Sequence, residues 1–235
     1  MLRVDHDIKV WAICFHEGST SNGTLTVGGV DDRLASGIIN YVADAGVNAN
    51  GDGFHSVNVH AVVLGSNTSS AAPSAVRIPT RSASRSSVAP SDLPQAAILD
   101  TGTNILLLPD YLIASLESSM CADESLVGCS DLWMANGGSG CVSLNDEEVA
   151  AYPPLSLELD GGLMLDMTAD DYLLLGSPLA EPGSGQYCLG IKVGDASYGG
   201  FIIGDTTMRH YYLVFDYTNR QIGWGDVNTG TCGSV

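Results

Sequence analysis

Apolar and polar residues alternate along much of the chain, in short runs bounded by glycine and other turn residues. The alternation is clear over residues 7–16, 54–64 and 153–159, and again over 164–167. A period of two is typical of a strand with one buried face. We therefore expect strands in these segments. Few long stretches have helical spacing, which indicates a mainly β fold with one or two short helices, in the all-β class.

One segment has the spacing of a helix. Leu112, Ile113, Leu116 and Met120 recur at intervals of one to four residues after Pro109. Proline suits the first turn of a helix, where its missing N–H leaves no hydrogen bond unmade. We therefore expect a helix that starts beside Pro109.

A short apolar strand, Ile98 and Leu99, runs directly into Asp100–Thr101–Gly102–Thr103. We expect Gly102 to let the backbone turn sharply, so that Asp100 is presented at a loop tip. The two threonine hydroxyls are donors that can fix the carboxylate oxygens. By themselves these residues are also compatible with an ordinary turn.

A second stretch changes that balance. Residues 200–216 form an apolar strand, a Gly204 break, a short polar segment and an aromatic strand, and residues 219–224 follow as its hairpin partner. The Asp-Thr-Gly loop and this closing segment, in this order and at this separation, resemble the C-terminal lobe of pepsin-like aspartic proteases. The resemblance runs from about Val10 to Cys232, with one poorly matching insertion.

The resemblance implies hydrolysis of peptide bonds by two carboxylates that share one proton and activate a water molecule. Asp100 would be one of the two catalytic aspartates, with Thr101, Gly102 and Thr103 supporting its loop. Thr101 would join the loop to its counterpart, and Thr103 would hydrogen-bond the outer carboxylate oxygen. Thr103 and Asn104 would bind substrate, although the family commonly has Ser or Thr where Asn104 stands. The family needs neither a cofactor nor a metal.

The chain has only one such loop, because Asp205 is followed by two threonines and lacks the glycine. We expect a missing N-terminal lobe to supply the second aspartate, and the chain alone to be inactive. Its substrate would be a protein or peptide. Two alternatives stay open: a non-catalytic binding or inhibitor protein on the same scaffold, and a homodimeric protease with one loop per chain.

Charge excludes one class of partner. The chain has 235 residues, a net charge of −18 and only nine lysines and arginines. It has no basic surface to neutralise phosphates, so we expect no nucleic-acid binding. The acidity is compatible with solubility alone, or with adaptation to acid, where carboxylates lose their charge.

The six cysteines indicate an oxidising compartment. No Cys-x-x-Cys pair and no histidine at ligand spacing accompanies them, so we predict three disulfides rather than a metal site. Cys121 and Cys129 are close enough in sequence to close a local loop. The resemblance implies that Cys141 pairs with Cys188, and Cys14 with Cys232.

Other signals concern location. Asn22 and Asn67 head glycosylation acceptor tripeptides, and no apolar run is long enough to span a bilayer. We predict a secreted protein or one in a vacuolar, lysosomal or other endomembrane lumen. The segment after Met1 does not resemble a signal peptide, so we expect that Met1 is not the natural start.

Residues 66–94 differ in composition from the rest of the chain. They are rich in serine, alanine and proline, and carry three of the nine basic residues, Arg77, Arg81 and Arg85. Such a segment buries little apolar area, so we predict a long mobile loop inserted into a single lobe that spans residues 1–235. A processing site or a partner-binding loop is the alternative to a tolerated insertion.

Overall fold

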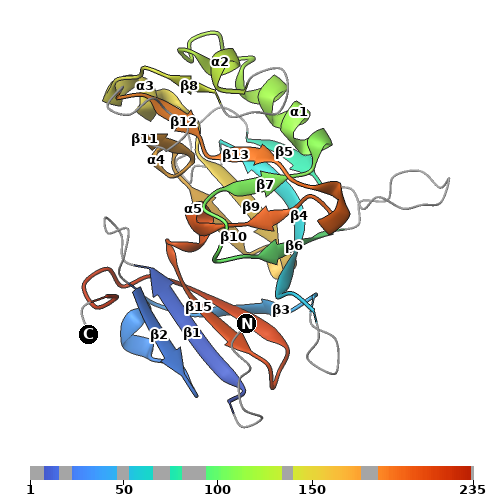
Figure 1. Cartoon of the computed structure of the whole chain (residues 1–235), viewed down its shortest axis with the longest axis vertical. Helices are drawn as coiled ribbons and strands as arrows, with labels where there is room; N and C mark the ends of the chain where they lie inside the picture. Colours follow the sequence, from blue (N-terminus) through green and yellow to red (C-terminus); the bar gives the residue numbers. More distant parts are fainter. Residues whose placement is uncertain are drawn as a thin grey trace, which may run out of the picture. The chain divides into compact units, whose positions relative to one another are not determined.

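A computed structural model describes residues 8–15, 23–46, 53–65, 75–80, 94–133, 140–175 and 185–233. The chain divides into two compact units (Figure 1). Unit 1 contains Met1–Val57 together with Thr207–Val235, and unit 2 contains Asn58–Thr206. The two ends of the chain therefore fold together, and the middle of the chain forms a unit of its own.

Unit 1 is built on a five-stranded antiparallel sheet whose strand order is β2-β1-β15-β16-β3. Its strands are β1 (Val10–Phe15), β2 (Gly23–Val27), β3 (Asn40–Ala43), β15 (Tyr211–Asp216) and β16 (Gln221–Asp226). The 3-10 helix η1 (Asp32–Leu34) lies between β2 and β3 in the chain. Strands from the two ends of the sequence meet at the β1–β15 pair, which places Ala12 opposite Val214.

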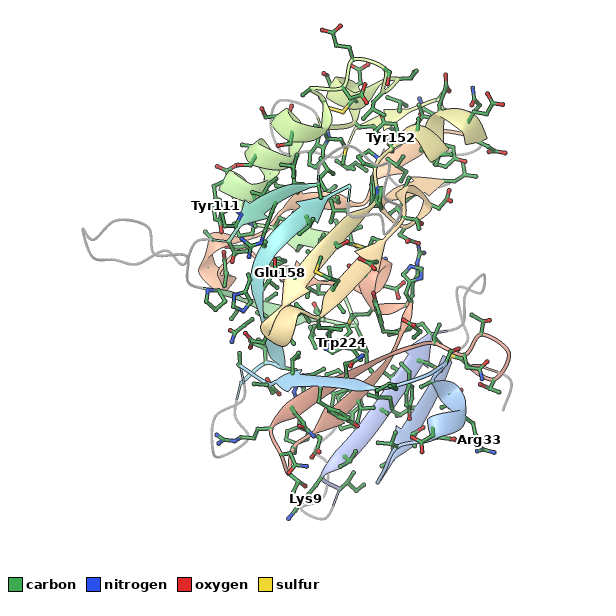
Figure 2. The ribbon with its side chains drawn as sticks, turned by 180° about the vertical axis from the view of Figure 1, so that it is seen from behind. Lys9, Arg33, Tyr111, Tyr152, Glu158 and Trp224 are labelled. Carbon is green, nitrogen blue, oxygen red and sulfur yellow. A yellow bond between two sulfur atoms is a disulfide. The ribbon has the colours of Figure 1, made fainter. Side chains whose placement is uncertain are left out.

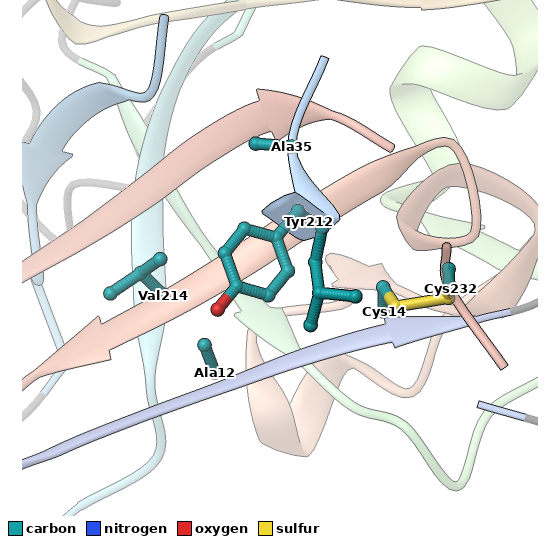
Figure 3. Packing of buried hydrophobic residues seen from close by; sticks show 7 residues of the cluster. Ala12, Cys14, Ala35, Tyr212, Val214 and Cys232 are labelled. Atoms are coloured by element: carbon teal, nitrogen blue, oxygen red, sulfur yellow. A yellow bond between two sulfur atoms is a disulfide. The ribbon is translucent and has the colours of Figure 1, made fainter. Parts of the chain in front are cut away.

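The core of unit 1 forms where β1 and β15 meet η1 and the end of the chain. Figure 3 shows Tyr212 and the Cys14–Cys232 disulfide within this cluster of buried side chains. The disulfide joins residues 218 positions apart, and a loop of this length reduces the entropy of the unfolded chain by an equivalent of about 5 kcal/mol. On the other face of the sheet lies the buried ring of Trp224 (Figure 2). It meets the ring of Tyr211 edge-on, with centroids 5.5 Å apart.

Unit 2 contains a larger sheet with strand order β10-β9-β4-β6-β14-β7-β13, and β5 pairs with β4 beside it. A three-stranded sheet, β11-β12-β8, accompanies it. The strands of the larger sheet are β4 (Ser56–Leu64), β5 (Val76–Pro79), β6 (Gln95–Leu99), β7 (Leu106–Leu108), β9 (Leu155–Leu159), β10 (Met164–Met167), β13 (Ile191–Val193) and β14 (Ile202–Ile203). Those of the smaller sheet are β8 (Cys141–Val142), β11 (Leu173–Leu175) and β12 (Tyr187–Leu189).

The helices are short. The longest, α1 (Asp110–Met120), starts after Pro109 and buries the four apolar side chains whose spacing predicted it. The described residues also contain α2 (Cys129–Trp133), α3 (Asp146–Ala151), α4 (Ala169–Tyr172), α5 (Asp205–Met208), and the 3-10 helices η2 (Asp160–Gly162) and η3 (Ala196–Tyr198). The mainly β fold is therefore confirmed, and no described helix is long and apolar enough to cross a membrane.

The segment predicted as a long loop contains a strand. Val76–Pro79 form β5, which pairs antiparallel with β4. Ile78 is 9% exposed, and the hydroxyl of Thr80 donates to the carbonyl of Val59. The composition of the segment obscured this short alternating run. Residues 66–74 and 81–93 lie outside the described part of the chain.

Three disulfides join the six cysteines. They are Cys14–Cys232, Cys121–Cys129 and Cys141–Cys188. Cys121–Cys129 links the end of α1 to the start of α2, and Cys141–Cys188 links β8 to β12. These are the pairs that sequence proximity and the resemblance imply.

Candidate active site

The candidate site begins where β6 ends. β6 runs parallel to β14, and the backbone N–H of Asp100 donates to the carbonyl of Ile203 at 3.1 Å. This hydrogen bond fixes the last point of regular pairing, after which the chain leaves the sheet. Asp100 therefore stands at the first position of a loop whose entry is held by a neighbouring strand.

The carboxylate of Asp100 is held by its own loop. Its Oδ1 accepts a hydrogen bond from the backbone N–H of Gly102 at 2.9 Å. Its Oδ2 accepts one from the hydroxyl of Thr103 at 2.7 Å. The N–H of Thr103 also donates to the carbonyl of Asp100, at 3.1 Å. Each carboxylate oxygen thus has a local donor, and each keeps a further lone pair for a water molecule or a substrate.

The chain turns at Thr101 and Gly102, directly after Asp100, as the sequence predicts. The residues with positive φ do not include Gly102. A Cβ atom at this position would lie 3.2 Å from Oδ1 of Asp100. The glycine therefore matters because it leaves room beside the carboxylate, and the backbone there does not need the left-handed region.

A second segment, residues 204–206, packs against the loop and donates backbone hydrogen bonds to it. The backbone N–H of Asp205 donates to the carbonyl of Thr103 at 2.7 Å, and that of Thr206 donates to the carbonyl of Asn104 at 3.3 Å. A Cβ atom on Gly204 would lie 2.3 Å from the carbonyl oxygens of both Thr103 and Ile105. Such contacts are too short for any side chain, so only glycine fits at position 204.

Sequence reasoning treated Gly204 only as a break between strands. Its position directly after the apolar pair Ile202 and Ile203, about a hundred residues from the Asp-Thr-Gly motif, was the sequence signal that could have assigned it to the site. The same stretch places Asp205 in α5, where its backbone supports the loop.

The structure brings three of the predicted site residues into direct contact: Asp100, Gly102 and Thr103. Thr101 and Asn104 are exposed on the same loop, whereas Asp100 and Thr103 are partly buried. The loop therefore offers a fixed carboxylate together with accessible neighbours. Such an arrangement can hold a water molecule or position a polar substrate group.

The remaining predicted residues lie elsewhere. The six cysteines form structural disulfides, and Asn22 and Asn67 lie outside the described residues. In the described parts of the chain, no three His, Cys, Asp or Glu side chains gather where they could hold a metal ion.

Comparison with known proteins identifies the family. The profile described as "Eukaryotic aspartyl protease" matches residues 6–227. Bovine (Bos taurus) Pepsin A is 22% identical over 218 residues, covering 93% of this chain and 47% of that protein. Aspartic proteinase 39 of Arabidopsis thaliana is 28% identical over 147 residues, covering 58% of this chain and 29% of that protein.

Chymosin of Camelus dromedarius is 30% identical over 128 residues, covering 54% of this chain and 28% of that protein. The chain thus spans less than half the length of these relatives. The family profile nevertheless covers most of the chain, from the first strand of unit 1 to the residue after β16, and includes the Asp100 loop. The chain belongs to the eukaryotic aspartyl protease family.

Proposed function

We propose that this chain is one lobe of an aspartic endopeptidase, in which Asp100 is one of two catalytic aspartates. The observation that carries the proposal is that hydrogen bonds fix the orientation of the Asp100 carboxylate. Gly102 and Thr103 hold it in one orientation, and the 204–206 segment supports its loop. A fixed carboxylate on a partly exposed loop is suited to acid–base catalysis.

The chemistry requires a second carboxylate close to the first. Two carboxyl groups at such a distance cannot both ionise, so they share a proton and their titration belongs to the pair. The ionised member takes a proton from water as the oxygen attacks the peptide carbonyl, and the protonated member polarises that carbonyl. Since the sequence holds one Asp-Thr-Gly loop, the second comes from another lobe, and this chain alone is inactive.

The neighbours of Asp100 take supporting roles in this proposal. The Thr103 hydroxyl keeps the carboxylate oriented through its 2.7 Å hydrogen bond. Thr101, exposed on the loop, contacts the corresponding loop of the second lobe. Asn104, also exposed, lies near the backbone of the bound protein or peptide substrate. No step needs a metal or a cofactor, since protons are moved by carboxyl groups.

The setting of the enzyme follows from its covalent and charge properties. Three disulfides favour an oxidising compartment. The net charge of −18 at neutral pH becomes less negative when carboxylates are protonated. Acid therefore lowers the electrostatic repulsion within the chain. We therefore propose secretion, or residence in an acidic endomembrane, vacuolar or lysosomal lumen.

The decisive experiment replaces Asp100 with asparagine in the assembled protein that carries both lobes. We expect Asp100→Asn to lower kcat for peptide cleavage at acid pH by at least about 10³-fold. Asp123→Asn is the matched control. Asp123 also accepts hydrogen bonds from a backbone N–H and a hydroxyl, both of Ser125, but lies in an exposed turn elsewhere in unit 2.

The two variants should unfold at similar temperatures, and only Asp100→Asn should lose activity. Full activity in the Asp100→Asn protein would contradict the proposal. If the assembled wild-type protein cleaves no peptide between about pH 2 and 6, the non-catalytic binding or inhibitor function is favoured instead.

A further inference from the structure

Unit 1 contains a group of hydrogen-bonded polar side chains that the proposed active site does not use. Asp44 follows β3, His55 precedes β4, and Tyr217 follows β15. Nδ1 of His55 lies 2.5 Å from Oδ2 of Asp44, and Nε2 of His55 lies 2.8 Å from the hydroxyl of Tyr217. We call these three residues the histidine latch. The latch joins both ends of the β3–β4 connection to the turn between β15 and β16.

Hydrogen-bond roles in the latch follow from the partners available. The other carboxylate oxygen of Asp44, Oδ1, accepts from the backbone N–H groups of Gly46 and Ser56, both at 3.1 Å. A carboxylate only accepts, so Nδ1 of His55 carries the proton. The Nε2 of a neutral ring then accepts from the Tyr217 hydroxyl.

Aromatic rings cover the latch. His55 lies against Phe215 and Tyr217, with ring centroids 4.7 Å and 4.9 Å away. Trp11 stacks on Phe215 at 3.9 Å and meets the His55 ring edge-on. The side chain of Asp44 is only 4% exposed, and that of His55 is 16% exposed. An interaction between these groups is therefore poorly screened by water.

Among the described residues, the ionisable side chains hydrogen-bonded to His55 are Asp44, at the end of β3, and Tyr217, in the β15–β16 turn. β1 contributes the uncharged indole of Trp11. The carboxylate of Asp216, the residue before Tyr217, accepts hydrogen bonds from Asn219 and Gln221. Burial raises the pKa of Asp44, but the hydrogen bonds from His55, Ser56 and Gly46 together lower it by more. The pKa of Asp44 therefore lies below its usual value.

Protonation changes the latch in a defined way. Histidine gains its charge between about pH 8 and 5. The proton adds to Nε2, which then donates to the Tyr217 oxygen. The Tyr217 hydroxyl proton must turn toward solvent, which it can reach because Tyr217 is 38% exposed. At the same time the Asp44–His55 contact becomes a hydrogen-bonded ion pair, a stronger interaction than one with a neutral ring.

We propose that Asp44, His55 and Tyr217 form a proton-sensitive latch in unit 1 that is tightest when His55 is charged and Asp44 is ionised. While His55 is neutral, the latch is a chain of hydrogen bonds around the imidazole. When His55 gains a proton, the latch becomes an ion pair that holds both ends of the β3–β4 connection to the β15–β16 turn. When Asp44 is protonated in strong acid, the ion pair is lost and the latch opens.

Urea unfolding of the whole chain tests the latch at pH 7.5, 5.0 and 2.5, values chosen to lie on either side of the ordinary histidine and aspartate pKa values, about 6.5 and 3.9. We expect His55→Gln to raise the unfolding equilibrium constant by a factor at least about five times larger at pH 5.0 than at pH 7.5. The difference should shrink again at pH 2.5.

The chain offers a matched control. His60 lies on β4 and bonds Asp160 at 2.7 Å, but both side chains are 32% exposed. Solvent screens such a pair, so the effect of His60→Gln should change by less than about twofold between pH 7.5 and 5.0. An effect of His55→Gln that is equal at these two pH values would overturn the proposal.

A second variant keeps the test valid if His55→Gln does not fold. Tyr217→Phe removes the acceptor of the Nε2 proton and leaves the ring contact with His55. We expect it to destabilise the protein about twofold more at pH 5.0 than at pH 7.5, because a charged imidazole needs this acceptor. The backbone N–H of Ser56 donates to Asp44. In the Tyr217→Phe protein, the protection of this amide against hydrogen exchange should fall more at pH 5.0 than at pH 7.5. A Tyr217→Phe protein with no such pH dependence would also contradict the latch.

Discussion

Asp44 in unit 1 and Asp100 in unit 2 both accept hydrogen bonds from nearby backbone N–H groups, but they lie in opposite environments. The carboxylate of Asp44 is 4% exposed and accepts from Gly46, Ser56 and His55. Asp100 is partly exposed and accepts from Gly102 and Thr103, both within its own loop. The Asp44 carboxylate joins the two ends of the β3–β4 connection, and the Asp100 carboxylate is oriented by its own loop.

This difference suits the two aspartates to different roles: a buried carboxylate stabilises the fold, and a partly exposed carboxylate can take part in a reaction. Removing the partner of a buried charge leaves that charge without compensation, which costs several kcal/mol. A partly exposed carboxylate with local donors can lose its charge at little cost to folding. We therefore expect substitutions at Asp44 to affect stability, and substitutions at Asp100 to affect activity.

The largest effect should come from the support of the Asp100 loop. Gly204→Ala places a methyl group 2.3 Å from the carbonyl oxygens of Thr103 and Ile105. The backbone must shift, so we expect a loss of about 3 kcal/mol or more in the free energy of unfolding. Urea denaturation measures this loss, and Gly29→Ala is the control, because nothing lies within 4 Å of a Cβ atom there. Equal stability of the two variants would show that the loop does not need this close contact.

A smaller effect is expected at Asp44. Asp44→Asn removes the charge that His55 and two backbone N–H groups stabilise, and should cost about 2–4 kcal/mol at pH 5. Because these hydrogen bonds lower the pKa of Asp44, its stabilisation is present above the unfolded pKa and is lost as pH falls through the lower, folded pKa. The cost of the substitution should therefore shrink below about pH 3.8.

The comparison for this variant is Asp160→Asn, which affects a histidine contact of similar length at 32% exposure. We expect it to cost less than about 1 kcal/mol at pH 5. Unfolding curves at pH 5 and pH 2.5 measure both variants. A loss at Asp44→Asn that is as large at pH 2.5 as at pH 5 would mean that packing, and not charge, is responsible.

The smallest effect concerns the orientation of Asp100. Thr103→Val removes the hydroxyl that donates to Oδ2 and should cost about 1 kcal/mol of stability. In the assembled enzyme kcat should fall about tenfold, since the carboxylate loses one of its fixed donors. Thr103→Ser should restore both quantities. Thr101→Val, on the exposed side of the loop, should leave the stability of the chain unchanged.

The sequence predicted the parts of the fold that depend on local pattern. Alternation over residues 54–64 and 153–159 predicted β4 and β9, and helical spacing after Pro109 predicted α1. The four- to six-residue helices α2–α5 were missed because they are too short to show a period. Two of them carry capping boxes, Asn145 with Glu148 and Thr168 with Asp171, a signal that the alternation-based prediction did not use.

By itself the sequence determined the mainly β class, the Asp-Thr-Gly loop and membership in the aspartyl protease family, because these depend on short local patterns and on their order along the chain. Tertiary structure alone decided how Gly204 supports that loop and how Tyr217 reaches His55, 162 positions away. Contacts of this kind depend on how strands pair across the fold. No local period of apolar and polar residues encodes them, since each partner alone is compatible with many arrangements.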